Sequence, residues 1–199
     1  MTGSGQHILR FTQDDILVIA ATDKELAPAA AWRTLRCGVG PVEAAATTAA
    51  AIAQHRPRAI LHVGIAGSRR RPVLEPPALV IGAESVYCDV AADNRWTPRI
   101  ITPSGILLEA AQRVLPDALT LPIGTSARVG GTSGCDIEAM EGFAVLRAAQ
   151  LAGIPAIEIR AIANEIAEPD RARWRFDEAF AAIVAATPAL VEEFARCVS

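Results

Sequence analysis

Short apolar runs that alternate with longer amphipathic stretches are the feature that most limits what this chain can fold into. Short, uninterrupted apolar runs are typical of strands buried on both faces of a sheet. Strands that alternate with helices predict an α/β domain. We therefore expect one domain over residues 1–199, with a central, mainly parallel but mixed sheet flanked by helices. The expected strands cover residues 16–21, 58–63, 78–83 and 156–162, with a weaker candidate at 32–39.

Helix signals lie between these strands. Pro41 stands at a first-turn position, where its missing N–H costs nothing. Gly153 is a typical helix-ending residue, and Pro188 predicts a kink or a restart in the last helix. The expected helices cover residues 41–55, 105–114, 137–152 and the chain end from about 177.

The composition excludes several classes of protein. Of the 199 residues, 51% are hydrophobic and 21% are charged, which a disordered chain would not show. A formal net charge of −3 argues against a nucleic-acid partner. No apolar run reaches the roughly 18 residues that span a bilayer, and residues 1–10 lack the apolar core of a secretory signal. We expect a cytoplasmic protein with no membrane partner.

The cysteines and histidines give no sign of a metal site. The four cysteines include no CxxC pair, and the three histidines have no ligand spacing to each other or to a cysteine. We expect buried free thiols, no metal and no cofactor.

Polar residues stand near the ends of several expected strands, which is where α/β sheets bind ligands. Glu25 follows the first strand, although the helix dipole also favours a carboxylate in a first helical turn. Residues 64–67 (GIAG) have the composition of a tight turn. Glu141 interrupts the apolar face of an expected helix, and a buried carboxylate needs a partner such as a sugar diol. Arg160 is also consistent with a structural ion pair to Glu158 or Glu165.

Taken in order, four segments resemble the purine nucleosidase and nucleoside phosphorylase superfamily, in the branch that holds methylthioadenosine/adenosylhomocysteine nucleosidase and futalosine hydrolase. They are ILVIAATDKEL from residue 16, GVGPVEAAATTAAAI from 38, AILHVGIAGS from 59 and DIEAMEGFAVLRAAQLAGIPAIEIRAIAN from 136. The resemblance implies a nucleoside phosphorylase-like fold and a cofactor-free enzyme that cleaves the N-glycosidic bond of a purine nucleoside. It also implies a homodimer or a higher homo-oligomer.

The resemblance assigns roles residue by residue. Glu25 falls at the catalytic glutamate that activates water for attack on the anomeric carbon. Glu141 falls at the glutamate that holds the ribose hydroxyls, and Met140 at the residue that packs against the sugar. The other substrate-binding positions that it implies are Ile65, Val129, Gly130 and Phe143.

The end of the match favours one branch. Asn164, followed by Pro169, Arg171 and Trp174, resembles the ending of futalosine hydrolase, whereas the methylthioadenosine enzymes have an aspartate in place of Asn164. The leaving purine needs a proton or strong hydrogen bonds at N7. An asparagine amide can donate to N7 or O6, which suits a 6-oxopurine. We therefore expect Asn164 to be catalytic and futalosine, a hypoxanthine nucleoside of menaquinone biosynthesis, to be the substrate.

Water is the expected nucleophile. Phosphorylases of the superfamily bind phosphate with arginines, one of which precedes the glycine sequence where this chain has His62. A neutral imidazole is a poor substitute for a guanidinium, and a satisfied core histidine fits the same position. The alternatives are a methylthioadenosine/adenosylhomocysteine nucleosidase, a purine nucleoside phosphorylase and a non-catalytic nucleoside-binding protein. Segments 25–38 and 124–140 are short for the family, and the arginines of 68–77 face either solvent or an acidic substrate tail.

Overall fold

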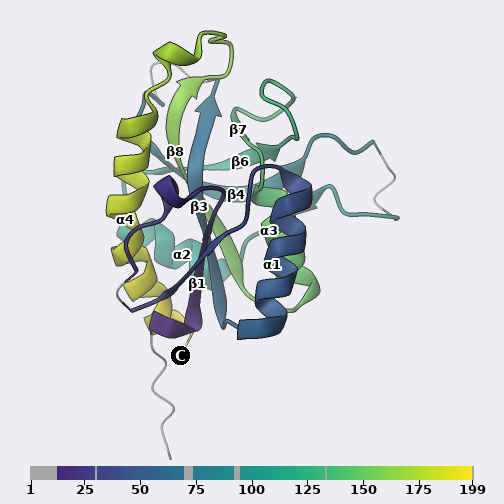
Figure 1. Ribbon diagram of the computed structural model, residues 1–199, viewed down its shortest axis with the longest axis vertical. Coiled ribbons are helices and arrows are strands. Elements are labelled where there is room, and N and C mark those ends of the chain that lie inside the picture. The colour runs from purple at the N-terminus through teal and green to yellow at the C-terminus, as the bar shows by residue number, and fades with distance from the viewer. Residues whose placement is uncertain (1–12, 30, 70–73, 92–94, 133, 199) are drawn as a thin grey trace, which may run out of the picture.

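The computed structural model describes residues 13–29, 31–69, 74–91, 95–132 and 134–198 (Figure 1). Its strands are β1 Ile16–Ala20, β2 Arg33–Arg36, β3 Ala59–Ser68, β4 Leu79–Tyr87, β5 Ile100–Ile101, β6 Leu119–Thr125, β7 Ile137–Ala139 and β8 Ala156–Glu165. Its α-helices are α1 Pro41–His55, α2 Gly105–Val114, α3 Gly142–Leu151 and α4 Phe176–Cys197. The 3-10 turns are η1 Gln13–Asp15, η2 Asp23–Glu25 and η3 Arg171–Arg173.

The strands form one mixed sheet that curls back on itself. Strand β3 pairs in parallel with β1 and β8, and β1 continues to β2. Strand β4 runs antiparallel to β8 and parallel to β6, and β7 joins β6 to β3. Strands β3, β8, β4, β6 and β7 therefore close into a ring whose filling includes Val80, Ile123, Ile137 and Ile162. The α/β prediction with a mixed sheet is confirmed.

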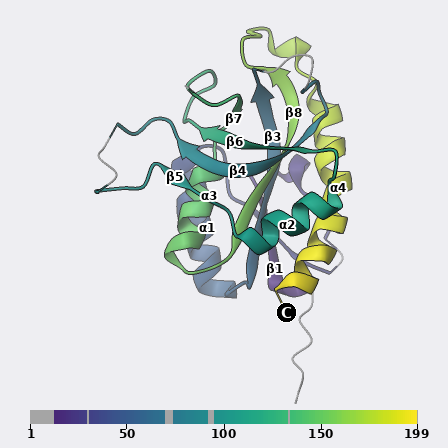
Figure 2. The same cartoon turned by 180° about the vertical axis from the view of Figure 1, so that it is seen from behind.

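Two helical layers cover the sheet. Helices α1 and α3 lie together on one side, and α4 lies on the other with α2 (Figures 1 and 2). The predicted bounds 41–55 and 105–114 are confirmed. Helix α4 continues through Pro188 without a restart, and the Thr187 hydroxyl donates to the Ile183 carbonyl one turn earlier at 2.7 Å. None of the helices in the described residues is both long and apolar enough to cross a membrane.

The prediction of a tight turn at 64–67 was wrong, because these residues continue strand β3. Both glycines lie where β8 approaches closely. A Cβ atom on Gly64 would overlap the Arg160 guanidinium, and one on Gly67 would lie 2.9 Å from Ile166 Cγ1. The glycines therefore make room for side chains of the neighbouring strand.

The single helix expected over 137–152 was also wrong. Residues 137–139 form β7, and the helix begins only at Gly142, with Glu141 as its N-cap residue. Strand β7 pairs with β3 and β6, which are separate segments of the chain. A pattern within residues 137–152 therefore does not reveal this pairing. Of the four free cysteines, Cys37 and Cys135 are buried as expected, but the other two are half-buried.

Candidate active site

A pocket of about 300 Å³ lies at the carboxyl ends of β1, β7 and β8, beside the second half of β3. This is the edge at which α/β sheets bind ligands. The pocket brings together most of the predicted site residues: Glu25, Ile65, Val129, Met140, Glu141 and Asn164 all line it. These residues come from five separate segments of the chain, so only the fold places them side by side.

Glu25 is held rigidly by its own turn. Its Oε2 accepts hydrogen bonds from the Thr22 backbone N–H at 2.8 Å, which is the glutamate half of a capping box, and from the Thr22 hydroxyl at 2.7 Å. Its Oε1 accepts from the Ile65 N–H at 3.2 Å. Only 4% of Glu25 is exposed. A carboxylate has about four acceptor positions, so these three bonds leave one for a molecule in the pocket.

Glu141 is the N-cap residue of helix α3 and lines the same pocket. Its Oε1 accepts from the Gly40 N–H at 3.1 Å, which fixes it to the start of α1. Its Oε2 lies 3.7 Å from Arg160 Nη1. Burial raises the pKa of Glu141, and the positive charge of Arg160 opposes that rise. The remaining acceptor positions of Glu141 are available to a ligand, because this side chain lines the pocket.

Arg160 is buried beneath the pocket and is shared between acidic groups. Its Nε lies 3.6 Å from Glu158 Oε1, and its Nη2 donates to His62 Nε2. His62 in turn donates from Nδ1 to the Ile19 carbonyl at 3.0 Å. Burial, and then the Arg160 charge, lower the pKa of His62 well below its ordinary value, so the imidazole is neutral. His62 is therefore a satisfied core residue, and the predicted ion pair of Arg160 with Glu158 is present.

Asn164 is the penultimate residue of strand β8 and is 8% exposed. Its Nδ2 donates to the Glu165 carbonyl at 2.9 Å and lies 3.1 Å from the position that a Cβ on Gly67 would take. The amide keeps a second N–H and its Oδ1 acceptor for a ligand.

Glu138 also lines the pocket, and sequence reasoning missed it. Its two oxygens accept from the backbone N–H groups of Gly130 and Thr132 and from the Thr132 hydroxyl. Glu138 thus fixes the loop that brings Val129 to the pocket, but Gly130, which was also expected at the site, is not among the residues that line it. An alternating apolar and polar pattern at 137–139 was the available signal, but three residues are too few to separate a strand from a helix.

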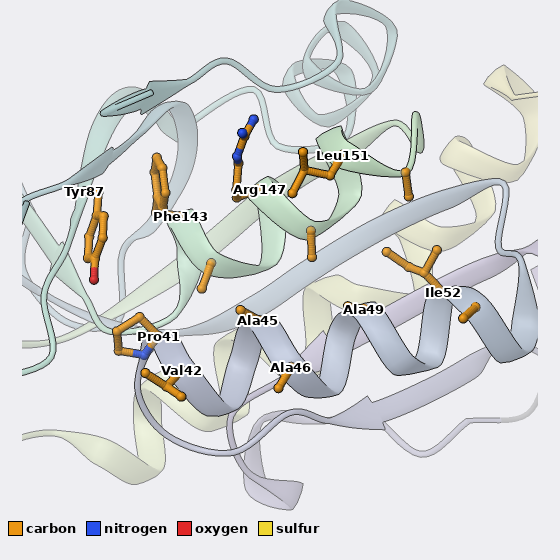
Figure 3. A pocket seen from close by; sticks show the side chains of 14 residues that line it. Pro41, Val42, Ala45, Ala46, Ala49, Ile52, Tyr87, Phe143, Arg147 and Leu151 are labelled. Atoms are coloured by element: carbon orange, nitrogen blue, oxygen red, sulfur yellow. The ribbon is translucent and has the colours of Figure 1, made fainter. Parts of the chain in front are cut away.

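The expectation that Phe143 walls this pocket does not match the structure. Its ring stacks on Tyr87, with centroids 5.0 Å apart, and lines a different, apolar groove of about 810 Å³ between α1 and α3. Figure 3 shows these two rings at one end of the groove, with Val42 across from them and Leu151 farther along α3.

Of the arginines in residues 68–77, which were expected to face either solvent or an acidic substrate tail, Arg69 does not match the second expectation. Arg69 donates to the carbonyls of Thr132 and Cys135, so its guanidinium is occupied by the loop beside it. Arg70 and Arg71 lie outside the described residues.

The fold therefore places three buried carboxylates, Glu25, Glu138 and Glu141, and the carboxamide of Asn164 around one ligand-binding pocket. Sequence comparison gives the family. The chain belongs to the phosphorylase superfamily, whose family model matches residues 33–119 and 127–196. A curated relative is the futalosine hydrolase of Streptomyces coelicolor, which is 31% identical over 179 residues, covering 76% of this chain and 75% of the relative. The futalosine hydrolase of Thermus thermophilus is 28% identical over 117 residues, covering 59% of this chain and 51% of that protein.

Solved structures agree on the fold. A methylthioadenosine/adenosylhomocysteine nucleosidase from Colwellia psychrerythraea, in complex with adenine, superposes with a TM-score of 0.80 at 17% identity and covers 93% of this chain and 97% of its own. The futalosine hydrolase of Helicobacter pylori gives a TM-score of 0.78, also at 17% identity, over 89% of this chain and 97% of its own.

Proposed function

We propose that the protein hydrolyses the N-glycosidic bond of a 6-oxopurine nucleoside, with futalosine as substrate and hypoxanthine and dehypoxanthinyl futalosine as products. The observation that carries this proposal is the pocket that Glu25, Glu141 and Asn164 line together. The match to futalosine hydrolase over three quarters of each chain supports the choice of substrate.

The arrangement of carboxylates suits a hydrolysis through an oxocarbenium-like transition state. The free acceptor position of Glu25 would bind a water molecule and take its proton as the water attacks the anomeric carbon. The remaining acceptor positions of Glu141 would receive the ribose hydroxyls. Two preorganised negative groups also stabilise the positive charge that develops on the sugar. Met140 and Ile65, which are half-buried in the pocket wall, would pack against the substrate.

The Asn164 carboxamide matches a leaving hypoxanthine. Its free N–H can donate to O6 or N7, and its Oδ1 can accept from N7 once that atom is protonated. An aspartate at this place would be acceptor-only when ionised and would face the O6 acceptor without a donor. The donor pattern of Asn164 therefore favours a 6-oxopurine over adenine.

Water rather than phosphate is the proposed nucleophile. Two cations lie at the pocket: the exposed Arg171, which belongs to its lining, and the fully buried Arg160. Arg160 donates to the neutral His62 and lies 3.7 Å from Glu141 and 3.6 Å from Glu158. A phosphate approaching Arg160 would meet the charges of Glu25 and Glu141 in a region of low dielectric, where like charges repel strongly.

We also propose a homo-oligomer, a cytoplasmic location and a place in menaquinone biosynthesis. The groove between α1 and α3 supports the first of these. Val42 and Leu151, which line it, are 77% and 71% exposed, and apolar area dominates its wall. A second copy of the chain would remove these side chains from water. Light scattering of the wild type and of Val42→Asp tests this, because a dimer through the groove would dissociate in the variant.

The proposed reaction is tested by the release of free base from futalosine, methylthioadenosine and inosine, each with and without phosphate. Hypoxanthine from futalosine at a rate independent of phosphate is the expected result. Adenine from methylthioadenosine as the main activity would contradict the role given to Asn164. Phosphate-dependent release with a sugar 1-phosphate product would contradict water as the nucleophile.

One variant with a matched control tests the role assigned to Glu25. Glu25→Gln keeps the size of the side chain but loses its basicity, and should reduce kcat by about a hundredfold or more. Glu192→Gln, at an exposed glutamate on α4, is the matched control and should leave the rate unchanged. A Glu25→Gln enzyme with wild-type turnover would overturn the mechanism.

A further inference from the structure

Beneath the pocket, the fully buried Arg160 lies between two carboxylates. Its Nη1 is 3.7 Å from Glu141 Oε2, and its Nε is 3.6 Å from Glu158 Oε1. A charge-assisted hydrogen bond between such groups is about 2.7–2.9 Å long, so Arg160 closes a hydrogen bond with neither carboxylate. Among the described residues, its Nε and Nη1 have no hydrogen-bond partner. Arg160 therefore lies at nearly equal distances from Glu141, which lines the pocket, and from Glu158, which does not.

Glu158 is a fully buried carboxylate for which two other elements make room. A Cβ atom on Gly82 of β4 would lie 2.7 Å from Glu158 Cγ, and one on Gly142, the first residue of α3, would overlap the Glu158 carboxyl group. The Ser85 hydroxyl of β4 donates to Glu158 Oε2 at 2.9 Å. The other oxygen, Oε1, accepts no hydrogen bond from the described residues and faces Arg160. Burying a carboxylate is unfavourable unless it has a partner, and Arg160 is the partner that this oxygen faces.

Glu141 and Glu158 share the positive charge of Arg160. Glu141 Oε1 accepts from the Gly40 N–H, whereas its Oε2 is the oxygen nearest to Arg160. A small movement of the guanidinium toward Glu141 would close a charge-assisted hydrogen bond and would occupy an acceptor position on Oε2. The charge of Glu158, on the other side of Arg160, opposes this movement.

We propose that Glu158 is a positioning residue, which keeps Arg160 away from Glu141 and so leaves the Glu141 carboxylate open to the hydroxyl groups of the bound sugar. Glu158 acts only through Arg160, because it does not line the pocket. Without the charge of Glu158, Arg160 closes on Glu141, and a hydroxyl then competes with a guanidinium for the same oxygen. This inference rests on the proposed function, in which Glu141 receives the ribose hydroxyls.

Protonation of Glu158 should have the same effect as removal of its charge. Burial raises the pKa of Glu158, and the charge of Arg160 and the hydrogen bond from Ser85 oppose that rise. Glu158 therefore gains its proton at a higher pH than an exposed glutamate does. In the described part of the chain, the other ionisable groups around this cluster are Glu141 before α3, His62 on β3, Glu25 in η2 and Cys37 after β2.

Steady-state kinetics with futalosine and 2′-deoxyfutalosine test this role. Glu158→Gln keeps the size of the side chain and can still accept from Ser85, but it loses the charge. We expect it to raise the KM for futalosine by about tenfold, with a smaller change in kcat. The KM for 2′-deoxyfutalosine should rise less, because this analogue lacks a hydroxyl that competes with Arg160 for Glu141. Glu192→Gln, at an exposed glutamate of α4, makes the same chemical change away from the site and should alter neither constant.

The pH dependence of KM separates positioning from a purely structural role. In the wild type, the KM for futalosine should rise as the pH is lowered, because protonation of Glu158 releases Arg160 toward Glu141. In Glu158→Gln the KM should already be high at neutral pH, and any further rise, which then comes from Glu141, should begin at a lower pH because Arg160 lies closer to it. Ser85→Ala should act in the opposite direction. It removes a hydrogen bond that lowers the pKa of Glu158, so the rise in KM should begin at a higher pH than in the wild type.

The outcomes distinguish this role from the proposed function. If the wild type releases no hypoxanthine from futalosine, the proposed function fails and this inference fails with it. If a folded Glu158→Gln enzyme keeps the KM values of the wild type, or raises them equally for both substrates, the function stands and Glu158 is not a positioning residue. If circular dichroism shows that Glu158→Gln does not fold, Ser85→Ala decides, and an unchanged pH profile of KM in Ser85→Ala overturns the inference.

Discussion

Gly64→Ala is the substitution whose effect follows most directly from the structure. Gly64 lies in the middle of β3, opposite Arg160 in the register of β8. A Cβ atom there would overlap Arg160 Nη1 and lie 3.1 Å from Glu25 Oε1. Arg160 is fully buried and holds Glu141, Glu158 and His62, so it has no open space into which to move.

The expected cost is that of breaking a buried ion pair. Removing one partner of such a pair typically destabilises a protein by about 3–5 kcal/mol, because the other charges stay buried without compensation. We expect Gly64→Ala to lower the free energy of unfolding by about this amount and to abolish most of the hydrolysis, since Glu25 and Glu141 would both shift.

Urea unfolding followed by circular dichroism measures the first effect, and hypoxanthine release measures the second. Gly105→Ala is the matched control, because a Cβ on Gly105 meets nothing within 4 Å and this glycine begins helix α2. The control should be neutral or stabilised by up to about 1 kcal/mol. A Gly64→Ala protein as stable and active as this control would refute the account of Arg160.

Three further outcomes follow from the site and its surroundings. Asn164→Asp should lower kcat/KM for futalosine and raise it for methylthioadenosine in the base-release assay, and an unchanged ratio of the two would count against the donor argument. Because burial lowers the folded-state pKa of His62, the unfolded state binds the extra proton as pH falls below about 6.5. The free energy of unfolding of the wild type should then decrease as the pH is lowered, by up to about 1.4 kcal/mol per pH unit. Urea titrations should show that this free energy depends less steeply on pH in His62→Gln. Glu141 and Glu158, whose raised pKa values act in the opposite direction, remain in both proteins. Burial raises the pKa of Cys37 to about 12, so mass spectrometry after iodoacetamide at pH 8 should find Cys37 unmodified in the native protein and alkylated in urea.

Local sequence signals predicted the elements whose ends depend on local chemistry. Helix α1 begins at Pro41 as expected, because proline fixes a helical φ and has no N–H to satisfy. Strands β1, β3, β4 and β8 were found from their apolar runs, although β3 and β4 extend farther than the runs do, whereas β5 and β6 were not predicted.

The missed elements depend on partners that are distant in sequence. Strand β7 has only three residues and exists because β3 and β6 lie on either side of it. The glycines of 64–67 resemble a turn until β8 is placed beside them, and only then does the approach of Arg160 explain Gly64.

Sequence motifs predicted site residues that the motifs themselves contain. They did not predict contacts that arise only when distant segments pack together. Glu25, Glu141 and Asn164 line one pocket, as the resemblance implied. Phe143 was expected there from the resemblance, but it is the second residue of helix α3 and its ring lines the groove between α1 and α3 instead. The charge contact between Arg160 and Glu141 joins β8 to the start of α3, and neither local segment contains a sign of it.

Hydrolysis of futalosine in ¹⁸O-labelled water, with excess phosphate present, tests the central claim most directly. If Glu25 activates water in this pocket, mass spectrometry of the sugar product will show one ¹⁸O atom at the anomeric hydroxyl and no sugar phosphate. The release of hypoxanthine should keep pace with that label and should be lost in Glu25→Gln. A phosphorylated sugar without the label, or labelled product from Glu25→Gln at the wild-type rate, would contradict the account.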